Sequence, residues 1–68
     1  MNRHKIETLK SFFDIVERDK HGFVVRKQKS DKLLHPDPCV NKLRELVPSA
    51  VIVDSFIHGG FITIEFYC

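Results

Sequence analysis

The 68-residue chain contains no apolar run that approaches the ~20 residues needed to cross a membrane as a helix. Its first ten residues, MNRHKIETLK, lack the apolar core of a secretory signal peptide. Only two cysteines are present, and thiols without a secretory signal are typical of a reducing cytoplasm. We therefore expect a cytoplasmic protein with no membrane segment.

The sequence also lacks the short motifs that accompany most cofactor and metal sites. It has no G-x-x-x-x-G-K-[ST] or G-x-G-x-x-G segment for phosphate binding. It has no C-x2-C or H-x3-H pair, so His35, Cys39, His58 and Cys68 make a weak metal set. Cys39 with His35 nearby suggests a nucleophile, but Cys39 lies on an apolar stripe and no third orienting residue is evident. We predict no catalytic residue, no metal and no cofactor.

The composition indicates one small globular domain over residues 1–68. Hydrophobic residues make up 43% of the chain and charged residues 29%, which is typical of folded rather than disordered proteins. This length is near the lower limit for folding without cross-links or partners, so a homodimer or a bound protein would help. The net charge of +2 is too small to indicate nucleic-acid binding by itself.

The first part of the chain predicts a helix followed by a strand. Between Arg3 and about Asp19 apolar residues recur at helical spacing, and Asn2 is a suitable cap. The apolar stripe comprises Ile6, Leu9, Phe12, Phe13 and Val16. Gly22 suits the end of this helix, and the β-branched segment Phe23–Gln28 predicts a strand.

Two prolines mark the start of a second helix. Asp37 is expected at the N-cap and Pro38 at the first helical position. The helix is predicted from Pro38 to about Val47, where Pro48 stops it. Its apolar face comprises Cys39, Val40, Leu43, Leu46 and Val47.

The segment VIVDSFIHGGFITIEFYC, from Val51 to Cys68, predicts a β-hairpin. Two runs rich in Val, Ile, Phe and Thr flank Gly59-Gly60, which is a strong signal for a two-residue turn. Folding the segment about this turn produces a core face of Val51, Val53, Ser55, Ile57, Ile62, Ile64, Phe66 and Cys68. The second face then carries the cross-strand pairs His58–Phe61, Phe56–Thr63, Asp54–Glu65 and Ile52–Tyr67.

The predicted order is α-β-α-β-β, and the fold class is α+β. We expect a small, three-stranded, mostly antiparallel sheet whose C-terminal hairpin packs against two helices. The strand Phe23–Gln28 can lie antiparallel beside Phe61–Tyr67 or parallel beside Val51–Ile57. We favour the antiparallel arrangement, because it brings the basic end of that strand near the acids of the hairpin.

The second hairpin face is the candidate functional surface. Asp54 opposite Glu65 is unusual, since like charges directly across strands are destabilising. Either Arg26 or Lys27 neutralises the pair from within, or a partner supplies the positive charge. We expect a non-catalytic protein-binding module, such as a regulator, an inhibitor or a complex subunit, that binds another protein or a second copy of itself stoichiometrically. The predicted partner-binding residues are Ile52, Asp54, Phe56, His58, Phe61, Glu65 and Tyr67.

Single-stranded nucleic-acid binding is the alternative. Aromatic side chains on a sheet beside a basic segment are typical of platforms that stack bases. The basic segment comprises Arg26, Lys27, Lys29 and Lys32. The facing acids would repel phosphates, so we rank this function second. The protein-binding interpretation in turn requires that both helices cover the core face and leave the aromatic face exposed.

Overall fold

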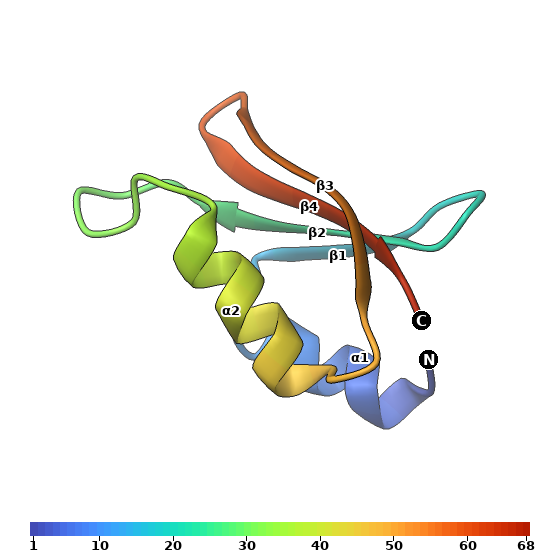
Figure 1. Ribbon diagram of the computed structural model, residues 1–68. Coiled ribbons are helices and arrows are strands. Elements are labelled where there is room, and N and C mark those ends of the chain that lie inside the picture. Colours follow the sequence, from blue (N-terminus) through green and yellow to red (C-terminus); the bar gives the residue numbers. More distant parts are fainter.

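A computed structural model describes all residues, 1–68, and shows an α+β fold with two layers. The strands are β1 (Ile15–Arg18), β2 (Phe23–Gln28), β3 (Val51–His58) and β4 (Phe61–Tyr67). They form one antiparallel sheet in the order β1-β2-β4-β3. The helices α1 (Arg3–Lys10) and α2 (Asp37–Leu46) both lie on the same face of this sheet (Figure 1). Neither helix is long and apolar enough to cross a membrane.

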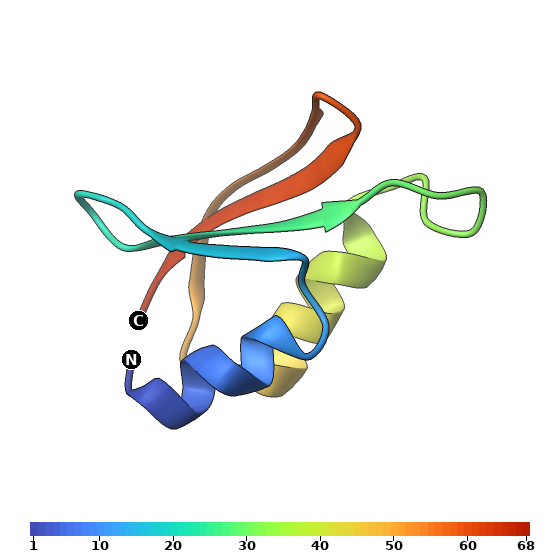
Figure 2. The same cartoon turned by 180° about the vertical axis from the view of Figure 1, so that it is seen from behind.

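The core lies between the helices and the covered sheet face. The sheet contributes Phe23 and Val25 from β2 and Ile62, Ile64 and Phe66 from β4. The other layer contributes Leu9, Phe13, Cys39, Leu43 and Val47. Because strand side chains alternate between faces, the alternate positions of β2 and β4 are directed away from the helices. The sheet therefore has one face that no helix covers, as the reverse view also shows (Figure 2).

The prediction of one helix from Arg3 to Asp19 is wrong beyond Lys10. The Asn2 side chain caps α1 as expected, accepting a hydrogen bond from the Lys5 N–H at 2.9 Å. After the helix ends, Ile15–Arg18 forms β1 and pairs with β2. Two β-branched residues and the ladder to β2 favour a strand here over continuation of the helical period. The sheet therefore has four strands instead of three.

The strand β2 has the predicted bounds, and α2 differs from its prediction by one residue at each end. Asp37 is the first residue of the helix rather than its N-cap, and Pro36 occupies the cap position without a side-chain hydrogen bond. Pro36 is already in the helical region, with φ −66° and ψ −27°, so the helix begins before Pro38. The predicted antiparallel pairing of β2 with β4 is confirmed.

The C-terminal hairpin is confirmed, but its register changes at a bulge. Gly59 and Gly60 have φ of 57° and 80°, the combination required by a type I′ turn. The predicted pairs hold from His58–Phe61 to Asp54–Glu65, and the register then shifts between Ile52 and Asp54. A bulge adds one residue to a strand and bends it, and β3 curves strongly as it leaves α2 (Figure 1).

The bulge exchanges the faces of the residues that precede it. Ile52 pairs with Phe66 instead of Tyr67 and packs against the core. Val51 pairs with Tyr67, and Val53 is 64% exposed. The predictions that Val51 and Val53 face the core and that Ile52 lies on the second face are therefore wrong.

Candidate functional site: the open face of the sheet

We call the sheet face that no helix covers the open face. Cross-strand partners project from the same side of a sheet, so the register defines its members. They are Ile15 and Glu17 from β1, Val24, Arg26 and Gln28 from β2, Val51, Asp54, Phe56 and His58 from β3, and Phe61, Thr63, Glu65 and Tyr67 from β4.

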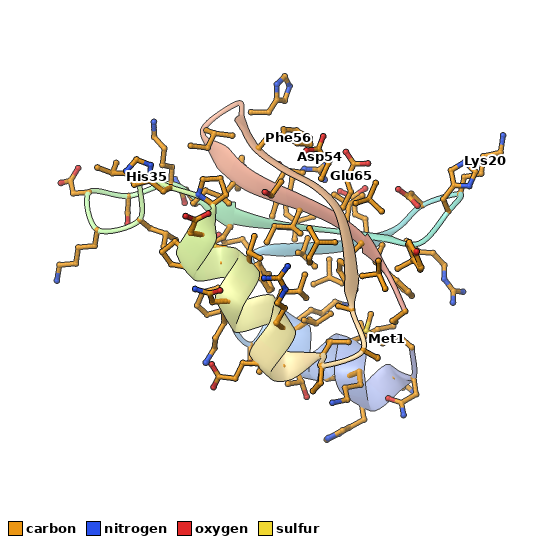
Figure 3. All side chains as sticks on the ribbon, viewed as in Figure 1. Met1, Lys20, His35, Asp54, Phe56 and Glu65 are labelled. Atoms are coloured by element: carbon orange, nitrogen blue, oxygen red, sulfur yellow. The ribbon has the colours of Figure 1, made fainter.

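A row of carboxylates crosses this face. Glu17 pairs with Val24, Val24 with Glu65, and Glu65 with Asp54, so three acids occupy one row across four strands. Phe56, Asp54 and Glu65 lie on the side of the sheet away from the helices (Figure 3). The acids of the hairpin thus extend to the opposite edge of the sheet through Glu17.

The cations of β2 do not neutralise the acid pair of the hairpin. Arg26 forms its ion pair with Glu17, at 2.5 Å between Nη1 and Oε1. Lys27 projects toward the helices, where its Nζ lies 3.9 Å from Asp14 Oδ1. Asp54 and Glu65 form no ion pair within the chain. The Asp54 carboxylate instead accepts a hydrogen bond from the Ser55 N–H at 2.9 Å. Because a backbone N–H carries no full charge, this bond does not neutralise the carboxylate.

Beside the acid row lies a more apolar row, which comprises Ile15, Arg26, Thr63 and Phe56. Thr63 is only 3% exposed although no helix covers it, because Phe56 and Arg26 flank it on the neighbouring strands. Phe56 and Phe61 are half-buried and expose parts of their rings. An acidic row next to aromatic rings suits contact with a segment that combines cationic and apolar side chains.

The structure brings together most of the predicted partner-binding residues. Asp54, Phe56, His58, Phe61 and Glu65 share the open face. Tyr67 lies at its end, 49% exposed and paired with Val51. Ile52 lies on the opposite face. Glu17 fell within the predicted helix, and the segment Ile15–Arg18, two apolar residues followed by two charged ones, has no period-two alternation that would indicate a strand.

The residues proposed for the nucleic-acid alternative do not form one surface. Arg26 and Lys27 project from opposite faces of β2, and both have acidic partners. Lys29 and Lys32 follow the strand in the connection to α2.

The nucleophile and metal hypotheses find no supporting geometry. Cys39 is fully buried on the core side of α2, and burial raises the pKa of its thiol, an effect that the charge of Lys27 partly opposes. A neutral buried thiol is a poor nucleophile. No group of three or more His, Cys, Asp or Glu side chains is placed to hold a metal ion, and both cysteines are free.

No protein-family model matches the chain, and comparisons with curated proteins and with solved structures found no match.

Proposed function

We propose that this protein is a small non-catalytic binding module that binds another protein stoichiometrically through its open face. The observation that carries the proposal is the uncompensated pair Asp54–Glu65, which faces no cation of its own chain. Like charges opposite one another on adjacent strands cost roughly 0.2–1 kcal/mol. A cationic partner turns this cost into attraction when it binds.

The chemistry of the face defines the class of partner. Three carboxylates and one arginine leave the open face acidic, although the whole chain carries a net charge of +2. Exposed parts of Phe56 and Phe61 add apolar and cation–π contact beside the acids. The partner is therefore a protein segment rich in Lys or Arg with interspersed apolar side chains, and its association is faster at low ionic strength.

A matched pair of variants tests this proposal. Asp54→Asn/Glu65→Gln removes both charges of the pair, whereas Asp31→Asn/Glu7→Gln removes the same charges from exposed positions off the open face. Each variant is immobilised and exposed to extract from the native host, and retained proteins are identified by mass spectrometry. We expect wild type and the control to retain a shared basic protein that the face variant loses.

Calorimetry with the purified partner then measures affinity and stoichiometry. We expect a whole-number ratio and binding at least about tenfold weaker for the face variant. Retention of the same partner at equal affinity by the face variant contradicts the proposal.

Single-stranded nucleic-acid binding has less support, because the open face carries more acid than base and the lysines are dispersed. Electrostatic binding of nucleic acid is strongest at low salt. Retention of single-stranded RNA or DNA at low salt would restore this alternative, and absence of binding there would remove it.

A further inference from the structure

The outer edge of β3 is an unpaired strand edge. In the order β1-β2-β4-β3, the strand β3 is last, and neither helix runs along its outer side (Figures 1 and 2). The residues that flank the two-residue turn, His58 and Phe61, form a hydrogen-bonded pair in this hairpin type. Alternation then directs the backbone groups of Ser55 and Ile57 away from β4. The Ser55 N–H agrees with this geometry, because it bonds to the Asp54 side chain instead of a strand.

We propose that β3 pairs antiparallel with β3 of a second copy of this chain and joins the two sheets into one. The segment Asp54–His58 between the bulge and the turn is regular and can form the new ladder. The outward backbone N–H and C=O groups of Ser55 pair with those of Ile57 in the second copy, and those of Ile57 pair with those of Ser55 in the second copy. Phe56 then lies opposite its own equivalent on the two-fold axis.

Hydrogen-bond complementarity between carboxylate and imidazole selects this register. It places Asp54 of each copy opposite His58 of the other, on the open face, where the pairing of side chains is closest. A register centred on Ser55 sets Asp54 opposite Phe56, and one centred on Ile57 sets it opposite Gly60. Only the Phe56-centred arrangement of these gives Asp54 an imidazole partner.

The pairing also gives new hydrogen-bond partners to the Ser55 N–H and the Asp54 carboxylate, whose mutual bond it breaks. The Ser55 N–H exchanges the Asp54 carboxylate for a carbonyl of the second copy, and the released carboxylate turns to His58. Exposed Ile57 gains a cover on the other face of the joined sheet. The inference goes beyond the proposed function, since it uses the strand edge and leaves Glu17 and Glu65 on the open face for another protein.

The mass of the protein in solution tests the proposal directly. Sedimentation equilibrium over a concentration series at low ionic strength is expected to show a reversible approach to twice the 7.9 kDa chain mass. A single species of chain mass at every concentration overturns the inference. Partner capture by Glu65→Gln, whose site on β4 lies off the proposed dimer contact, is a separate readout, so failure of one proposal does not imply failure of the other.

Exchange of Asp54 and His58 tests the register. His58→Asp creates two facing carboxylate pairs across the two-fold axis, and Asp54→His removes the carboxylates that accept from His58; each is expected to weaken association about tenfold. The double variant Asp54→His/His58→Asp restores both carboxylate–imidazole pairs and is expected to recover affinity. If the losses of the single variants add in the double variant, the register is wrong.

A second pair of variants tests the edge itself. Ile57→Lys places a charge at the new interface and is expected to abolish association, whereas Leu34→Lys makes the same exchange at an exposed loop position and leaves it intact. Circular dichroism confirms that each variant is folded. Equal association of the two lysine variants overturns the proposal.

Discussion

Replacing Glu65 by Gln is expected to stabilise the isolated chain. Glu65 lies directly opposite Asp54 on β3, and neither carboxylate has a cationic partner. Gln keeps the shape of the side chain and leaves the bond from the Ser55 N–H to Asp54 in place. Removal of one like-charge pair from adjacent strands is worth roughly 0.5 kcal/mol, within the usual range for such pairs. The expected rise in Tm is about 2–4 °C for a domain of this size.

Thermal unfolding followed by circular dichroism measures this difference, on samples dilute enough to be monomeric. At about 1 M salt the Debye length falls to ~3 Å, so wild type and Glu65→Gln should converge. Glu7→Gln on exposed α1 is the control, because its carboxylate forms no ion pair and its removal should leave Tm nearly unchanged. Destabilisation by Glu65→Gln, or a gain that persists at high salt, would refute the electrostatic argument.

Other predictions concern the thiols and the glycines. A thiol reagent should modify exposed Cys68 at once in the folded protein and buried Cys39 only on unfolding. The variant Cys68→Ser should therefore not react in the native state. Rapid labelling of that variant would show that Cys39 is accessible. Burial raises the pKa of the Cys39 thiol, so the protonated thiol favours the folded state. This contribution to the free energy of unfolding is complete below pH about 9 and is lost as the pH rises above that value. Urea titrations of Cys68→Ser and of Cys39→Ala/Cys68→Ser across this pH range would measure the difference. A Cβ on Gly22 would lie 2.4 Å from the Phe66 carbonyl oxygen, so Gly22→Ala should cost about 2 kcal/mol by steric overlap. Gly60→Ala meets no atom but must adopt φ +80°, and should cost about 1 kcal/mol; equal urea midpoints for wild type and either alanine variant would contradict the corresponding prediction.

The parts of the fold that the sequence predicts depend on local signals. Gly59-Gly60 between two β-branched runs defines the hairpin and its turn, and the two prolines define the start of α2 to within one residue. The strand β2 is bounded by Gly22 and by a basic polar segment. In each case short-range sterics and turn chemistry agree with the tertiary structure.

The parts that the sequence misses depend on long-range pairing. Phe12, Phe13 and Val16 fit a helical stripe, but Val16 enters the core from a strand whose backbone bonds to β2. The Asp14 carboxylate also accepts the Gln28 N–H at 2.6 Å, a contact that no local pattern indicates. The bulge at Val53 has a similar origin, since it bends β3 between α2 and the sheet. It decides which of Ile52 and Val53 packs in the core.

The strand β1 affects the charge of the open face more than it affects the rest of the fold. If Glu17 lay on a helix, Arg26 would remain free to pair with Asp54 and Glu65, and the negative charge of the hairpin acids would be partly neutralised within the chain. Because β1 adds Glu17 to the same row, Arg26 pairs with it, and the acids of the hairpin stay unmatched. The most exposed of these, Asp54, lies on the edge strand, where the open face and the unpaired backbone meet. A partner that brings a cation to this position therefore relieves the repulsion and gains the contact, whereas a second copy paired along the edge of β3 would meet Asp54 with the imidazole of His58.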